Sequence, residues 1–152
     1  MSSFTEIKYP NAEKELKELL KAAGVQAGYF QNALSVEGDS MAEIAAINEL
    51  GGVTDEGNHV PPRPFMSRAA KESEKEVIAL FQKEAKKQGY NSANVMKKIG
   101  LLIIGLIKKQ IQISKSWAKE NAPLTIELKG SDQPLVDDGT LLKSADYKVK
   151  TK

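Results

Sequence analysis

The chain has 152 residues, of which 28% are charged and 41% hydrophobic, the usual composition of one globular domain. Its 22 basic and 20 acidic residues leave a net charge of +2, which gives no support to nucleic-acid binding by bulk charge. The absence of cysteine excludes a disulfide framework, a thiolate nucleophile and a cysteine-ligated metal.

The first predicted elements precede residue 31. Residues 3–8 form a weak strand pattern, and Asn11 is typical of the residue that caps a helix start. The following residues lie on one helical face: Ala12, Leu16, Leu19, Leu20 and Ala23. Gly24 is a typical helix stop, so we expect this helix to end at Ala23. Residues 25–30 alternate in the manner of a strand.

A second helix is predicted after a loop near residues 31–39. The sequence from Ser40 to Glu43 matches a capping box, which places the helix start at Met41, and Gly51-Gly52 end the helix. The expected buried stripe consists of Met41, Ile44, Ala45, Ile47 and Leu50. Residues 52–60 are polar and rich in glycine, so we expect a second flexible loop there.

A stiff arm follows this loop, because three of the next four residues are proline: Pro61, Pro62 and Pro64. Proline restricts its own φ and moves the preceding residue out of the helical region. The prolines therefore hold Arg63 and Phe65 in place before any contact forms. Phe65 could anchor in the protein's own core or in a neighbour's groove, and Arg63 could pair with Glu49 or with a partner's carboxylate.

Two longer helices are predicted next. The first covers residues 67–88 and ends at Gly89, and its apolar positions are Ala70, Val77, Ile78, Leu80 and Phe81. The second starts at a cap on Ser92 or Asn94 and runs to about Ser114. Its apolar face is wide: Val95, Ile99, Leu102, Ile103, Leu106, Ile107, Ile111 and Ile113. Such a face needs partners on two sides, so this helix should be central. Its two glycines, Gly100 and Gly105, are expected to admit another backbone.

The apolar run from Ile99 to Ile107 spans about 13.5 Å as a helix, roughly half of a hydrocarbon core. The first eight residues also lack an apolar run of signal-peptide length. We therefore expect a buried helix and a soluble protein without a membrane association.

The last third contains shorter elements. Residues 121–130 suggest a short capped turn or helix, the sequence Asp137-Asp138-Gly139 indicates a turn, and residues 141–149 alternate like a final strand. Together these elements predict one α+β domain covering residues 1–152, with a small, mostly antiparallel sheet of about three to five strands packed with several helices.

No catalytic, cofactor-binding or metal site is predicted. His59 is the one histidine and sits in a polar loop, which favours a solvated side chain over a metal ligand. Asp137 and Asp138 are adjacent in a turn sequence, which favours a turn over a general acid. The sequence contains none of the common nucleotide-binding, hydrolase or zinc-protease motifs. We therefore expect a protein that is not an enzyme.

Three motifs occur in order along most of the chain: AEIAAINELG at 42–51, PPRPFMSR at 61–68, and a C-terminal pair, NAPLTIELKG at 121–130 with PLVDDGTLLKSADYKV at 134–149. The sequence resembles the tail-completion and neck proteins of tailed bacteriophages, the group around lambda minor tail protein Z and the Mu-like virion morphogenesis proteins. Two positions depart from the family pattern. Leu50 replaces a phenylalanine, and Asp138 replaces a threonine.

The resemblance implies a non-enzymatic virion protein at the head–tail junction, present in the host cytoplasm during assembly. It would act in a ring of its own copies, against other neck, connector or tail-terminator proteins. The candidate partner-contact residues are Pro61, Pro62, Arg63, Pro64, Phe65, Arg68, Asp137 and Asp138.

The alternative is a DNA-contacting neck or packaging accessory protein. That role would use lysines: Lys97, Lys98, Lys108, Lys109, Lys148, Lys150 and Lys152. Glutamates nearby in sequence, such as Glu84, could instead pair with the lysines that flank the central helix.

Overall fold

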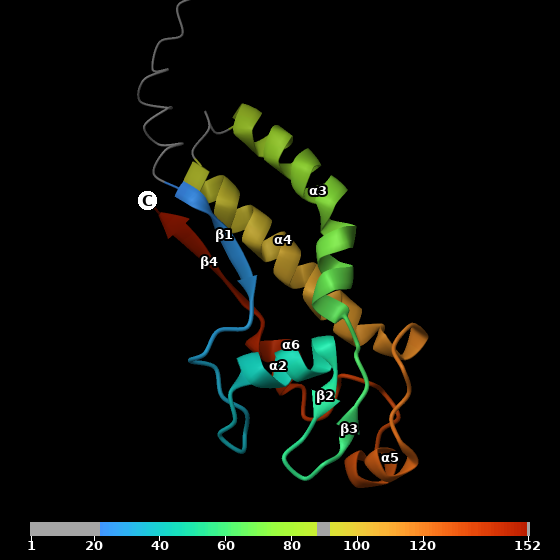
Figure 1. Cartoon of the computed structure of the whole chain (residues 1–152). Helices are drawn as coiled ribbons and strands as arrows, with labels where there is room; N and C mark the ends of the chain where they lie inside the picture. Colours follow the sequence, from blue (N-terminus) through green and yellow to red (C-terminus); the bar gives the residue numbers. More distant parts are fainter. Residues whose placement is uncertain (1–21, 88–91, 152) are drawn as a thin grey trace, which may run out of the picture.

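The computed structural model describes residues 22–87 and 92–151. Their fold is α+β, as predicted (Figure 1). Two long helices, α3 (Phe65–Lys87) and α4 (Ser92–Gln112), run side by side, and a two-stranded sheet lies along α4. The shorter elements gather at the end of the molecule where α3 begins.

The sheet beside α4 pairs strand β1 (Ala22–Gly28) with strand β4 (Asp146–Thr151) in antiparallel fashion. The predicted strand at residues 25–30 is therefore confirmed, but it starts earlier. The expected helix end at Ala23 and stop at Gly24 were wrong, because β4 supplies hydrogen-bonding partners to both ends of β1. Residues 1–21, including the weak strand and most of that helix, lie outside the described residues.

Helix α4 is central, as its wide apolar face predicted, because it packs against α3, β1 and β4. It ends at Gln112, and a short 3₁₀ helix, η1 (Ser114–Ser116), follows. Gly100 lies against the side chain of Tyr147, where a Cβ would overlap the ring. Gly105 faces open space, so the expected close approach there was wrong.

Helix α3 begins at Phe65, two residues earlier than predicted. The start is shifted because the carbonyl of Pro64 already accepts the first helical hydrogen bond, from the Arg68 N–H. Ala69 faces the core, whereas the predicted position Ala70 is exposed. The predicted stop at Gly89 lies outside the described residues.

Helix α2 (Met41–Leu50) has the predicted bounds, but two details differ. Ser40 makes no side-chain cap, and the Met41 N–H bonds to the carbonyl of Ala33. Leu50 is 77% exposed and Glu49 only 8%, so the end of the predicted apolar stripe was wrong by one position. The expected loop at residues 52–60 contains a small hairpin, β2 (Gly52–Val53) with β3 (His59–Val60).

The C-terminal third contains the predicted short helix, α5 (Pro123–Lys129), which ends at a left-handed Gly130. The predicted strand at residues 141–149 was wrong in its first half, which forms helix α6 (Thr140–Ser144). The described strands number four, divided between two antiparallel two-stranded sheets, where one sheet of three to five strands was expected.

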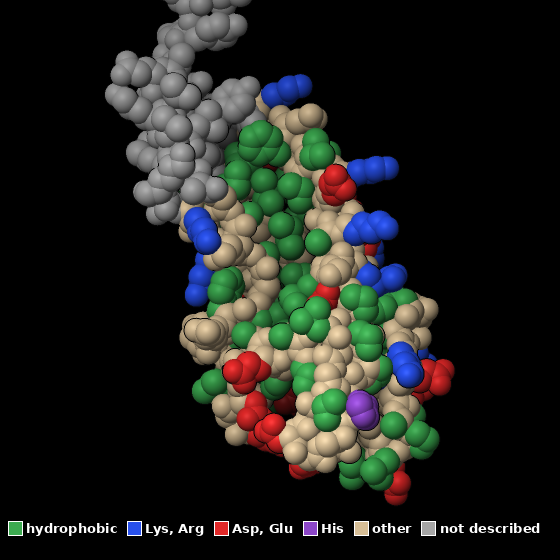
Figure 2. Space-filling view, in the orientation of Figure 1, with side chains coloured by type: hydrophobic (Ala, Val, Ile, Leu, Met, Phe, Trp, Pro, Cys, Tyr) green, Lys and Arg blue, Asp and Glu red, His purple; other side chains and the backbone are tan. Residues whose placement is uncertain are grey.

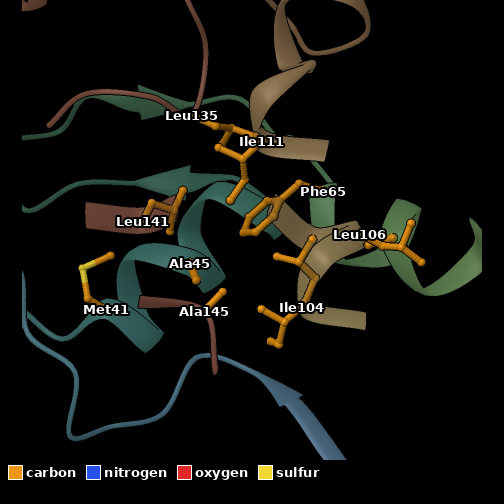
Figure 3. Close-up of a cluster of buried hydrophobic side chains, with 11 residues drawn as sticks. Met41, Ala45, Phe65, Ile104, Leu106, Ile111, Leu135, Leu141 and Ala145 are labelled. Atoms are coloured by element: carbon orange, nitrogen blue, oxygen red, sulfur yellow. The ribbon is translucent and has the colours of Figure 1, made fainter. Parts of the chain in front are cut away.

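The core joins these elements around Phe65, which is completely buried (Figure 3). Its ring meets the ring of Tyr29 edge to face, with the ring centres 6.0 Å apart. The buried hydrophobic cluster around it contains Met41, Ala45, Ala69, Ile104, Leu106, Ile107, Ile111, Leu135, Leu141 and Ala145. Helices α2, α3, α4 and α6 therefore share one core.

Candidate functional site

The segments that carry the sequence motifs meet at the end of the molecule formed by α2, α5 and α6. We call this end the motif lobe and define it as residues 31–68 and 119–145, which includes the loop after β1. Its two segments are far apart in the sequence, so only the fold brings them together. All of the predicted partner-contact residues lie in this lobe.

Glu49 joins α2 to the start of α3. Its carboxylate accepts hydrogen bonds from the backbone N–H groups of Met66, at 2.8 Å, and Ser67, at 3.0 Å. The Ser67 hydroxyl donates a further hydrogen bond to the same carboxylate, at 2.5 Å. A helix start has N–H groups without intrahelical partners and a partial positive charge, so a buried carboxylate is well placed there.

Arg63 joins the proline arm to residues 119–121. Its Nε donates to the Lys119 carbonyl at 2.9 Å, and its Nη2 donates to the Glu120 carbonyl at 3.3 Å and to Asn121 Oδ1 at 3.0 Å. Burial lowers the pKa of the guanidinium. Glu49 is not the partner of Arg63, since its carboxylate caps α3, and two backbone carbonyls and the Asn121 side chain accept the hydrogen bonds of Arg63 instead.

The C-terminal motif segments are joined to each other in the same way. Asn121 Nδ2 donates to the Gln133 carbonyl at 3.3 Å, and Lys129 Nζ donates to the same carbonyl at 3.4 Å. The hydroxyl of Ser114 donates to the Pro134 carbonyl. This network holds the segment that leads into the turn at residues 137–139.

The structure answers the question that the sequence left open for Phe65. Its ring packs in the protein's own core, and the Arg63 side chain is also buried. Both side chains therefore make their contacts within the chain, and Arg63 also lines the cavity described below. Arg68 also has partners within the chain: its guanidinium lies 4.6 Å from the centre of the Trp117 ring, and its Nε donates to Gln110.

The prolines of the arm shape its path. Pro62 and Pro64 are exposed and Pro61 is partly buried. Gly51 has a φ of +74°, and a Cβ there would lie only 2.9 Å from Pro62 Cδ. The turn after α2 therefore needs a glycine for two reasons, its backbone conformation and the close approach of the arm.

The motif lobe contains a cavity of about 500 Å³. Arg63, Asp137 and Asp138 all line it, so the fold brings these three predicted residues to one place. Its floor is apolar, and the loop after β1 forms part of its rim. The remaining lining residues are Ser35, Val36, Glu37, Asp39, Met41, Ile44, Asn48, Asn121, Thr125, Lys129, Leu135, Thr140 and Leu141.

The charges at this cavity are mainly acidic, and Figure 2 shows acidic side chains around a hollow below α2. Hydrogen bonds from the side chain and backbone N–H of Thr140 lower the pKa of Asp138, which fits its position before α6. Burial lowers the pKa of Lys129, and the charge of Asp137 opposes this effect. Among the described residues no group of three or more metal-ligating side chains is found.

The sequence did not predict a set of large apolar side chains exposed on the motif lobe. They come from the loop after β1, the end of α2, the β2–β3 hairpin and α5: Leu34, Val36, Leu50, Val53, Leu124 and Leu128. The only signal available was the spacing of Leu124 and Leu128, which places them on one face of a helix too short to bury it. Leu128 is 79% exposed.

The lysines proposed for DNA contact are partly engaged within the chain. Lys98 pairs with Glu84 at 2.5 Å, and Lys109 pairs with Glu72. The Glu84 pair was anticipated from the sequence. Lys148 lies 4.1 Å from the centre of the Phe30 ring, where it makes a cation–π contact. These contacts reduce the number of charges available to a phosphate backbone.

Of the helices that the structure describes, none is both long and apolar enough to cross a bilayer. Comparisons of the chain with protein-family models, with curated proteins and with solved structures found no match.

Proposed function

We propose that the protein is a non-enzymatic structural component of a tailed-phage virion. It acts at the head–tail junction, where it completes the tail end or joins the tail to the capsid connector as part of a ring. Its partners are copies of itself and other neck, connector or tail-terminator proteins. The proposal rests on the motif resemblance and on the way the motif residues are used in the fold.

The observation that carries the proposal is the mutual contact of the motif residues. Glu49 of the first motif bonds to Met66 and Ser67 of the second, and Arg63 bonds to Asn121 of the third. These hydrogen bonds join residues that are 17 to 58 positions apart in the sequence. The motifs therefore describe one physical unit, which supports treating the resemblance as a single signal.

The exposed apolar side chains support an assembly role. The motif lobe presents a set of large hydrophobic residues to solvent on loops, a hairpin and a short helix. Exposed apolar residues that gather in one region are typical of protein–protein contact surfaces. A virion component must present such surfaces to its neighbours, and the exposed leucines of α5 are suitable for a direct test.

The test uses complementation of a tailed phage that lacks the gene. Wild-type protein should restore infectious particles and should be detected at the neck or tail end by immuno-electron microscopy. The variant with Leu124→Ser and Leu128→Ser should melt at the wild-type temperature, because both side chains are exposed, yet restore few particles. Leu101→Ser, on the exposed side of α4, is the matched control and should complement.

Two results would count against the proposal. One is the recovery of infectious particles from which the protein is absent. The other is equal complementation by the α5 variant and the control. The DNA-contacting alternative predicts instead that binding to duplex DNA weakens steeply with salt and depends on Lys97 and Lys108, since Lys98 and Lys109 are already paired with glutamates.

A further inference from the structure

Two surfaces on different parts of the molecule carry charges of opposite sign beside exposed apolar side chains. The first is the mouth of the cavity in the motif lobe. Val36, at its rim, is 82% exposed, and four carboxylates lie around it: Glu37, Asp39, Asp137 and Asp138. The cavity floor contains the apolar side chains of Met41, Ile44, Leu135 and Leu141.

The loop that carries Val36 is held in a defined conformation. Leu34 and Ser40 form an antiparallel bridge, and the Ser35 N–H donates to the Asp39 carbonyl at 2.8 Å. The Asp39 N–H donates in turn to the Ser35 hydroxyl at 3.0 Å. Because the loop is closed by its own hydrogen bonds, little freedom remains to be lost when Val36 meets another surface.

The second surface is the solvent-facing side of α3. Lys71, Lys75, Ile78 and Lys86 are spaced at i, i+4, i+7 and i+15, so they lie on one helical face. All four are exposed, Ile78 to 53%, and the exposed Glu74 lies at the edge of the same face. Within the described part of the chain these three lysines take part in none of the ion pairs. Figure 2 shows basic side chains along this side of the molecule.

We infer that the α3 face of one copy docks at the cavity mouth of a second copy. Ile78 covers Val36 and the apolar floor, and the lysines on either side of Ile78 meet the carboxylates of the rim. Lys75 and Lys71 precede Ile78 by about 4.5 and 10 Å along the helix axis, so both can reach a rim that surrounds the cavity. The contact rests on the proposed function, because it supplies the interface between subunits of the ring.

The geometry of the contact determines the kind of assembly. The two surfaces are different, so each copy can use its α3 face on one neighbour and its cavity mouth on another. Such a head-to-tail contact produces a ring when the rotation closes and an open chain when it does not. A two-fold dimer would instead require one surface to contact itself.

The chain has no cysteine, so a disulfide can be used to trap the contact. One variant carries Val36→Cys and a second carries Ile78→Cys; both sites are exposed, so each variant should fold normally. Mixed and oxidised with copper–phenanthroline, they should form a covalent heterodimer in high yield. Val53→Cys, exposed on the β2–β3 hairpin, is the matched control for Val36→Cys and should give little product with Ile78→Cys.

Charge reversal tests the electrostatic part of the contact. Glu37→Lys with Asp39→Lys in the first cysteine variant should abolish the heterodimer, and so should Lys71→Glu with Lys75→Glu in the second. When both reversed chains are mixed, the charges are complementary again and the heterodimer should return. Lys83→Glu with Lys87→Glu changes the same charge elsewhere on α3 and should leave the yield unchanged.

The outcomes separate this contact from the proposed function. The contact would be overturned if Val36→Cys and Val53→Cys gave equal yields with Ile78→Cys. It would also be overturned if the main product were a disulfide-linked dimer of Ile78→Cys. Loss of cross-linking with no rescue in the doubly reversed mixture would also overturn it. If the trap succeeds while the protein is absent from virions, the proposed function fails and the contact stands. If the protein is found in virions but the disulfide between Val36→Cys and Ile78→Cys does not form, the contact fails and the proposed function stands.

Discussion

Glu49 and Leu50 show how much a single position matters. A helical period alone places Leu50 on the buried face of α2, but the structure exposes Leu50 and buries Glu49. The reason is the start of α3, where the N–H groups of Met66 and Ser67 need acceptors and Glu49 provides two carboxylate oxygens. Helix α3 needs a hydrogen-bond acceptor from another element at its start, and this need determines which of the two residues faces inward.

We expect Glu49→Ala to lower the free energy of unfolding by about 1–3 kcal/mol, because it leaves two part-buried N–H groups at the start of α3 without their acceptor. Glu43→Ala, on the same helix but exposed, is the control and should stay within about 0.5 kcal/mol of wild type. Urea denaturation of the three proteins measures the difference. Equal losses for both variants would show that the Glu49 hydrogen bonds contribute nothing specific.

Phe65 and Arg63 were expected at a partner contact, and the structure gives both of them contacts within the chain. Phe65→Ala should cost about 3–5 kcal/mol of stability, since the ring is fully buried. Phe81→Ala removes the same atoms from a partly exposed site on α3 and should cost clearly less. Arg63→Ala should also destabilise, because the carbonyls of Lys119 and Glu120 lose their donor. Thermal melting checks all three, and a wild-type melting temperature for Phe65→Ala would contradict the structure.

At the scale of elements, α4 determines the arrangement because it contacts both α3 and the β1–β4 sheet. Its apolar pattern is long and regular, so its existence and central position follow from the sequence. Its two glycines look alike in sequence and have different surroundings. Gly100 lies against Tyr147 of β4, and Gly105 faces open space. Only the packing of the sheet on the helix distinguishes them.

The two glycines provide a matched pair of variants. Gly105→Ala should stabilise the protein by about 0.5–1 kcal/mol, because alanine has the higher helix propensity and its methyl group meets nothing. Gly100→Ala should destabilise, because its Cβ would overlap the Tyr147 ring and the sheet would have to shift. Chemical denaturation gives both values. A stabilising Gly100→Ala would show that the sheet is not packed on this part of α4.

At the scale of the whole molecule, the mainly acidic cavity, which Arg63 and Lys129 also line, is separate from the mainly basic outer side of α3, which also carries Glu74. Carboxylates surround the cavity of the motif lobe, and the lysines on the outer side of α3 take part in none of the ion pairs of the described residues. The net charge of +2 conceals this separation, because the opposite charges cancel in the sum. The head-to-tail contact that we propose between copies uses this separation.

We expect the chain to be folded and monomeric in dilute solution, since four of its helices share one buried core. Self-association should appear at high concentration and weaken with added salt, because exposed charges are screened over about 8 Å at physiological ionic strength. Sedimentation velocity across concentration and salt measures both effects. A tight two-fold dimer that is insensitive to salt would contradict a head-to-tail contact.

The sequence by itself determined the features that depend on neighbouring residues. The bounds of α2, the short helix α5 with its glycine stop, the turn at Asp137-Asp138-Gly139 and the α+β class all follow from local patterns of apolar, capping and turn residues. The central position of α4 followed as well, because a wide apolar face can only be buried between two partners.

Only the tertiary structure decided where distant segments meet. Strand β1 already includes Gly24, where the sequence predicted the end of a helix, because β4 pairs with β1. Residues 140–144 form α6 because Leu141 packs in the core around Phe65. Arg63 and Asp138 line one cavity although they are far apart in the sequence. Local propensities amount to about 1 kcal/mol or less per residue, whereas burial of one large side chain contributes roughly 1.5–3 kcal/mol, so long-range packing prevails where the two disagree.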